Sequence, residues 1–267
     1  MRTHQMALVV VVVVGLVLGL VSCGAAGDDL GAALPGVDGL TIALPVVATV
    51  AAKTGEPAEL WLLTRRTADS LNGAIGSVVG QMGRLLGQPP TAAGDGMAEW
   101  GPFTPPLSPV TYHLVAERSS AGVVAYHLDG RPKSGGDFVV LVAGTAAADG
   151  HAGEVHVDLA GLRVLDPAAP PDGSGLSVGY DVAPTVTTLA FQLDGAHYAY
   201  AQRASGSGDL GFDGPAGAIR AGWLASGAGR AEVDGVVVEC WDDAFRLVFG
   251  AGPGGHEGDP SACPDVR

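Results

Sequence analysis

Residues 186–203 read VTTLAFQLDGAHYAYAQR, two runs of β-forming residues that meet at Asp194-Gly195. Threonine, valine, phenylalanine and tyrosine favour extended backbone, and Asp-Gly tolerates the positive φ angles of a two-residue hairpin turn. The same dipeptide recurs at Asp129-Gly130 and Asp234-Gly235. The stretch therefore predicts an antiparallel hairpin, and its recurrence predicts a meander.

Short runs of β-forming residues alternate with Gly, Asp and Pro over most of the chain beyond Thr111. At 154–159, Glu-Val-His-Val-Asp-Leu alternates polar with apolar residues, as a strand with one solvated face requires. Ten strands are predicted, at Thr111–Arg118, Val123–Leu128, Phe138–Ala143, Glu154–Ala160, Leu176–Tyr180, Val186–Leu193, His197–Arg203, Ile219–Leu224, Ala231–Cys240 and Ala244–Phe249. They predict a mostly β (α+β) fold, an antiparallel meander that is strongly curved or closed into a barrel.

A short helix is predicted from Pro45 to Lys53, and a long helix is predicted after it and ahead of all the strands, from Pro57 to Leu86, with Gly87 ending it. The apolar residues of the long helix recur at intervals of four, three, four and three and form one stripe: Leu71, Ile75, Val78, Met82 and Leu85. We expect this stripe to pack on the inner face of the sheet. It then either completes a filled core or lines a cavity for an apolar ligand.

Four glycines, Gly73, Gly76, Gly80 and Gly83, also lie three or four residues apart in this helix. Such a groove lets another backbone approach, either as a membrane-type glycine interface or as a helix lying tightly over a sheet. Nearby charges at Arg65, Arg66, Asp69 and Arg84 argue against a bilayer span. The helix-over-sheet interpretation is therefore favoured.

The amino terminus carries an unbroken apolar stretch of 15 residues, Ala7 to Val21. A spanning helix needs about 20 such residues, so the length fits the apolar region of a signal peptide. Leu20-Val21-Ser22-Cys23-Gly24 then resembles the lipobox of bacterial lipoproteins. The resemblance implies cleavage before Cys23 and a diacylglycerol on its thiol. The alternatives are an ordinary signal peptide with a chance cysteine, or an uncleaved anchor helix.

These signals divide the chain into a signal peptide at 1–22, a lipidated Cys23 with a flexible tether at 23–44, and one helix-plus-meander domain at 45–267. Glycine, not aspartate, follows the cysteine. By resemblance to lipoproteins of two-membrane bacteria, this implies the outer membrane, with the domain facing the periplasm or the cell surface.

Three further segments carry a second resemblance: Glu99-Trp100-Gly101-Pro102-Phe103, Gly227-Ala228-Gly229-Arg230-Ala231, and Glu239 to Arg246. They resemble a family of uncharacterised lipoproteins from GC-rich bacteria, over about Pro57 to Phe249. The resemblance implies an architecture and no activity.

The charge balance narrows the range of partners. Fourteen basic and 28 acidic residues give a formal charge of −14, which repels phosphate backbones and argues against nucleic-acid binding. No polybasic patch serves anionic lipid. We therefore expect a membrane contact through the lipid anchor, and an envelope protein or an apolar ligand as partner.

Two cysteines remain besides Cys23. In an exported domain, Cys240 and Cys263 predict one disulfide. The alternatives are two free thiols or a metal-binding pair, for which no nearby cysteine or histidine cluster exists in the sequence.

The search for chemistry gives only weak candidates. His151, Glu154, His156 and Asp158 form a set that could hold a metal, although a solvated strand with alternating charge has the same pattern. His113 and His127 lie on adjacent predicted strands and are candidates to pair across a hairpin. No Gly-x-Ser-x-Gly or phosphate-loop motif occurs, so no catalytic residue and no cofactor is predicted. The favoured function is a non-catalytic binding or structural domain; the alternatives are an apolar-ligand carrier and a hydrolase.

Overall fold

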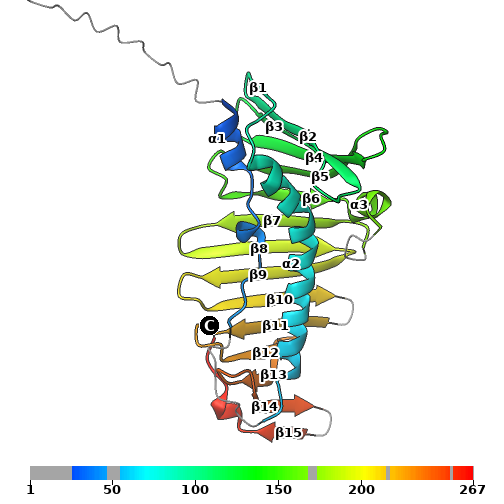
Figure 1. The fold of residues 1–267 in the computed structure, drawn as a ribbon. Helices are drawn as coiled ribbons and strands as arrows, with labels where there is room; N and C mark the ends of the chain where they lie inside the picture. Colours follow the sequence, from blue (N-terminus) through cyan, green and yellow to red (C-terminus); the bar gives the residue numbers. More distant parts are fainter. Residues whose placement is uncertain (1–25, 47–54, 168–172, 215–216, 253–254, 267) are drawn as a thin grey trace, which may run out of the picture.

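The computed structural model describes residues 26–46, 55–167, 173–214, 217–252 and 255–266. Its architecture is a single antiparallel sheet of fifteen strands, paired in strict chain order from first to last (Figure 1). The strands are β1 Ala92–Gly94, β2 Met97–Phe103, β3 Val110–Arg118, β4 Val124–Pro132, β5 Val139–Ala146, β6 Ala152–Val157, β7 Leu176–Val182, β8 Val186–Leu193, β9 Ala196–Arg203, β10 Gly208–Gly214, β11 Gly217–Trp223, β12 Gly229–Val233, β13 Val236–Trp241, β14 Leu247–Gly252 and β15 Gly255–Gly258. The predicted mostly β, antiparallel class is confirmed.

The expected number of about ten strands was wrong, and of the two expected forms, a strongly curved meander or a barrel, the barrel is not formed. The sheet stays open, because β1 and β15 each pair with one neighbour only. Four strands escaped prediction, β1, β2, β10 and β15, and the predicted strand Ala231–Cys240 is the hairpin of β12 and β13. The sequence of β10, GDLGFDG, explains why this strand was not predicted, because glycine and aspartate have low strand propensity. Its backbone is extended through pairing with β9 and β11.

Two of the three predicted Asp-Gly turns are present. Asp194 and Asp234 have φ angles of 48° and 50°, and the glycines that follow have 81° and 82°. Asp129-Gly130, in contrast, lies inside β4. Glycine serves there for close packing, because a Cβ at Gly130 would lie 2.5 Å from a methyl group of Leu141.

One helix crosses nearly the whole sheet. α2, Glu59–Leu86, begins beside β13 and β14 and ends beside β2, across the strand direction (Figure 1). The 28 residues of α2 span about 42 Å. The sheet measures about 53 Å from β2 to β13, because these strands are eleven spacings of about 4.8 Å apart. One helix is therefore long enough to cover one face of most of the sheet.

The apolar stripe of α2 is buried along its whole length. Its five residues, Leu71, Ile75, Val78, Met82 and Leu85, are each at most 2% exposed. They belong to one apolar core with strand residues such as Leu114, Leu128 and Phe191. The stripe is thus part of a filled core.

The glycines of α2 do not make the close approach that their spacing predicts. A Cβ built at Gly73, Gly76, Gly80 or Gly83 meets no neighbouring atom within 4 Å. The favoured interpretation of these glycines, a tight contact with the sheet, was therefore wrong, since larger residues of α2 face the core instead.

Residues 26–44, the described part of the segment 23–44, do not form the flexible tether that its composition predicts. They contain α1 (Ala26–Ala33) and a 3₁₀ turn, η1 (Asp38–Leu40). Leu30, Leu34, Leu40 and Ile42 are buried in the core that α2 also covers. The backbone of Ile42 exchanges two hydrogen bonds with the side chain of Asn72 on α2. Buried apolar residues and the Asn72 side chain therefore hold this segment on the core. The short helix predicted from Pro45 to Lys53 lies, from residue 47 on, outside the described residues.

The other face of the sheet carries short and polar side chains. In β8, Leu189 and Phe191 are buried while Ala190 between them is exposed, and the alternation repeats in β9 at Ala199 and Tyr200. The short helix α3 (Leu159–Leu165) packs beside β4 and β5 on the opposite, core side, where Leu159 and Leu162 join the core that α2 covers. On the face that carries Ala190 and Ala199, no second sheet and no long helix lies among the described residues (Figure 1). We call it the open face.

We predict that Ile75→Ala lowers the free energy of unfolding by about 2–5 kcal/mol, because the lost side chain leaves a cavity in a filled core. Leu63→Ala on the same helix is the control, since Leu63 is 44% exposed, and it should cost less. Denaturant melts measure both variants. Equal small losses would show that the stripe does not pack as described.

Candidate functional site

A large cleft, about 960 Å³, lies where α2 begins against β13, β14 and β15. Its titratable lining residues are mostly acidic: Glu56, Glu59, Arg66, Glu239, His256 and Glu257. A large cleft with a buried carboxylate is where a catalytic group is first sought. The hydrogen bonds of Glu239 decide whether that group is free to react.

Glu239 on β13 caps the start of α2. One carboxylate oxygen accepts from the backbone N–H of Glu59 at 2.9 Å, and the other from Leu60 at 2.8 Å and Trp61 at 3.2 Å. Ala58, which precedes the helix, offers no capping side chain. Glu239 therefore satisfies three of the four N–H groups that every helix leaves unpaired at its start.

Burial raises the pKa of Glu239 above the ordinary glutamate value, and the three N–H donors partly oppose the rise. A raised pKa in a cleft is one mark of a general acid. Here both oxygens are already occupied by backbone donors. The environment of Glu239 is thus explained by helix capping.

Aromatic rings hold the same end of α2. The Trp61 ring stacks on Phe245 with centroids 4.5 Å apart and lies 5.5 Å from Trp241 and 6.1 Å from Trp223. Trp241 donates from its indole N–H to the carbonyl of Gly227. Cap and rings together tie the start of the helix to β11, β13 and the β13–β14 turn.

An apolar cavity lies between α2 and β9–β11, but it is small. Its volume is about 180 Å³, and its lining is Leu63, Thr64, Thr67, Tyr198, Leu210, Phe212 and Ile219. Pockets for drug-sized ligands measure about 300–1,000 Å³. None of the five stripe residues proposed to line a ligand cavity borders this one.

The proposed metal set does not converge. Glu154 and His156 remain neighbours, 3.6 Å apart, and His156 Nδ1 lies 2.9 Å from the Ser177 hydroxyl. Asp158 has left the strand, because β6 ends at Val157 and Asp158 accepts the N–H of Gly161 as the cap of α3. His151 lies before β6 begins. Within the described ranges, no three His, Cys, Asp or Glu side chains stand close enough to hold a metal ion.

Histidines and carboxylates alternate on the open face of β2–β4. His113 Nε2 lies 3.4 Å from Glu99, and Asp129 is 3.9 Å from His113 Nδ1 and 3.5 Å from His127. The β3–β4 register places Asp129 opposite His113, so the two histidines meet through Asp129 instead of directly. One oxygen of Asp129 is buried without a partner in the described structure.

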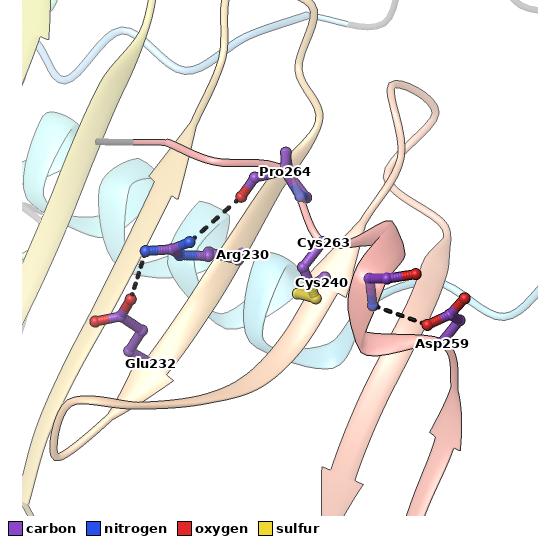
Figure 2. Close-up of a disulfide and its surroundings, with 7 residues drawn as sticks. Arg230, Glu232, Cys240, Asp259, Cys263 and Pro264 are labelled. Atoms are coloured by element: carbon purple, nitrogen blue, oxygen red, sulfur yellow. Dashed lines mark hydrogen bonds and ion pairs between the residues drawn. A yellow bond between two sulfur atoms is a disulfide. The ribbon is translucent and has the colours of Figure 1, made fainter.

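The predicted disulfide is present, between Cys240 on β13 and Cys263 in the carboxyl-terminal tail (Figure 2). It holds the tail on the open face, where Arg230 donates to the carbonyl of Pro264 at 3.5 Å. Beyond Pro264, the Val266 side chain packs on Gly222, where a Cβ would come within 2.9 Å of it. The tail thus forms a raised border across β11–β13.

We predict that Glu239→Ala lowers the free energy of unfolding by about 2–4 kcal/mol. The backbone N–H groups of Glu59, Leu60 and Trp61 would lose the buried carboxylate that accepts their hydrogen bonds. Glu239→Gln should cost less, since its amide oxygen still accepts. Glu257→Gln, exposed in the same cleft, should change the free energy by no more than about 0.5 kcal/mol. Urea melts of the three variants test this, and a neutral Glu239→Ala would contradict the capping role.

The raised pKa of Glu239 sets a sign for the pH dependence. The folded protein binds the proton of Glu239 more tightly than the unfolded chain does, so protonation of Glu239 stabilises the fold. This contribution to the free energy of unfolding is complete below the ordinary pKa of 4.5 and is lost as the pH rises through the folded-state pKa. The stability of the wild type relative to Glu239→Gln should therefore fall as the pH rises from below 4.5 toward neutrality. Melts in a buffer series measure the difference, and an increase over that range would refute the assignment.

The disulfide closes a loop with a sequence separation of 23 residues. Replacing both cysteines, Cys240→Ser with Cys263→Ser, should lower the free energy of unfolding by about 3 kcal/mol, because the unfolded chain regains freedom. Ser261→Ala in the same tail is the control and should have little effect. A double variant as stable as the wild type would show that the tail adds nothing to stability.

In the part of the chain that the structure describes, no helix combines the length and the apolar character needed to cross a bilayer. No protein-family model, curated protein or solved structure matches the chain. The resemblance to uncharacterised lipoproteins of GC-rich bacteria therefore stays a prediction.

Proposed function

We propose that this chain is a lipid-anchored protein of the bacterial cell envelope, with a non-catalytic binding or structural domain that works through its open face. The filled core beneath α2 carries the proposal. A carrier needs a hollow between helix and sheet, but the stripe residues of α2 are at most 2% exposed there. The side of the sheet that remains in water is the broad, polar open face.

The anchor is proposed from the sequence, because Cys23 lies outside the described residues. Its place in the chain constrains the geometry. α1 begins at Ala26 and packs against β1, β2 and β3. Three residues reach at most about 10 Å, so a lipid on Cys23 would hold the β1 end of the sheet near the bilayer. The rest of the sheet would then extend from this anchored end.

The alternative functions have less support. The 180 Å³ apolar cavity beside α2 suits at most a small molecule and is too small for a lipid. For a hydrolase, the buried carboxylate in the 960 Å³ cleft is Glu239, and both of its oxygens accept hydrogen bonds from the backbone of α2. The binding or structural domain remains the best-supported function.

We predict that mass spectrometry of the membrane fraction finds Cys23 as the first residue, carrying diacylglycerol and an acylated amine. Cys23→Ser should abolish the adduct and either release the domain or stall its processing. Cys263→Ser is the control, since it removes a different cysteine and should leave the anchor intact. Full-length, unmodified protein in the wild type would overturn the proposed anchor.

A further inference from the structure

Three arginines converge on the open face of a chain that carries only twelve arginines and two lysines against 28 acidic residues. Arg203 lies on β9, Arg220 on β11 and Arg230 on β12. Together with Asp209, Glu232 and Val266 they line a cavity of about 230 Å³. Such a concentration of guanidinium groups is unusual for a protein with a formal charge of −14.

Two of the three arginines are balanced by carboxylates inside the cavity. Arg203 lies 3.4 Å from Asp209, and Arg230 lies 3.0 Å from Glu232. Arg220 stands opposite Glu232 in the β11–β12 register, yet among the described residues no carboxylate lies within 4.0 Å of its guanidinium. The cavity therefore holds one positive charge in excess.

The Arg230 side chain is fixed in place. Its terminal nitrogens contact Glu232 and the carbonyl of Pro264, as Figure 2 shows. Its Nε is buried and has no acceptor in the described structure, and the side chain is only 13% exposed. This N–H is closed off from the cavity, so Arg230 adds a fixed positive charge to the wall, and a ligand would meet its guanidinium only through the terminal nitrogens.

The floor of the cavity is formed by paired strands, and one border of it is held by a disulfide. Gly222 forms part of the lining, and Val266 packs directly on it. Val266 follows Cys263 by three residues, so the Cys240–Cys263 disulfide holds this border of the cavity. A preformed border spares a ligand the cost of ordering the tail when it binds.

We propose that this cavity binds the oxyanion group of an envelope molecule, a phosphate, sulfate or carboxylate, with Arg220 as its main ionic contact. Guanidinium groups bind oxyanions through paired, charge-assisted hydrogen bonds. The volume admits a head group and not a whole polymer, so the rest of the ligand lies along the open face. This inference rests on the proposed binding function and gives that function a ligand chemistry.

The test uses purified full-length protein in detergent, titrated up to tens of millimolar with inorganic phosphate, sodium sulfate or sodium glucuronate at constant ionic strength. Binding is followed by isothermal calorimetry. Arg220→Gln should weaken the best of the three ligands about tenfold or more, because one charged contact is lost. Arg131→Gln is the matched control, since Arg131 lies on the same face over the Phe138 ring, and it should bind like the wild type.

The border supplies a second readout. The Cys240→Ser, Cys263→Ser double variant should also bind more weakly, because Val266 is no longer held on Gly222. No binding of any of the three ions, or an equal loss in Arg220→Gln and Arg131→Gln, would overturn the site. The ligand that binds best distinguishes a phosphorylated or sulfated partner from a uronic acid.

The same samples separate this inference from the function on which it rests. NMR spectra of glucose 6-phosphate incubated with the wild type report any hydrolysis of the ester. An unchanged ester agrees with a binding domain. Release of inorganic phosphate that Arg220→Gln abolishes would contradict the non-catalytic function while leaving the oxyanion site in place.

Discussion

The burial of one helix stripe against one face of the sheet is the interaction on which the rest of the structure depends. A single sheet of fifteen strands has no second sheet to cover it, so its apolar side chains need another element. α2 provides most of that cover, joined by the buried residues of the segment around α1 and η1. Its direction across the strands lets one helix contact elements as distant as β2 and β12.

Such a helix has to be held at its ends. At its start, the carboxylate of Glu239 and the rings around Trp61 tie it to β11–β14. At its end, Leu86 and Trp100 enclose Gly31, where a Cβ would lie 3.3 Å from Leu86. The two ends of the helix are therefore joined to strands from opposite ends of the sheet.

Residues along the strands alternate between the core and the open face, so the same pattern determines the side chains of both. In β8 and β9, the exposed alanines Ala190 and Ala199 alternate with the buried Leu189, Phe191 and Tyr200. Charged and titratable side chains cluster at two places on the open face. One is the group of His113, Asp129 and His127, and the other is the set of three arginines near the tail. A surface of this kind suits recognition of a polar partner better than uptake of an apolar one.

Much of this could be predicted where local chemistry decides the outcome. The hairpin at 186–203, the helix to Leu86 and the Cys240–Cys263 pair all follow from residue types and spacing. The Asp95-Gly96 turn, with φ angles of 52° and 80°, carries the same signal as Asp194-Gly195 and would have revealed β1 and β2. The strand β10 could not be predicted from its own residues, because its glycine-rich backbone is held in an extended conformation by pairing with β9 and β11.

The candidate sites depend still more on distant contacts. Glu239 caps a helix that begins 180 residues earlier in the chain, and no local pattern marks that role. The alternating pattern predicts that Asp158 belongs to a strand, but β6 ends at Val157 and Asp158 caps α3. The arginine cavity joins β9, β11, β12 and the tail, so it exists only after the meander has set their register.

The central claim is that α2 occupies one side of the sheet and that the open face is kept free for a partner in the envelope. Alkylation of introduced cysteines measures this directly, with Ala190→Cys and Ala199→Cys on the open face and Val236→Cys as an exposed reference in a hairpin. The account predicts that the two open-face thiols react as fast as the reference in purified protein and several times more slowly than it in isolated native envelopes. Equal rates at all three positions in both preparations would contradict it.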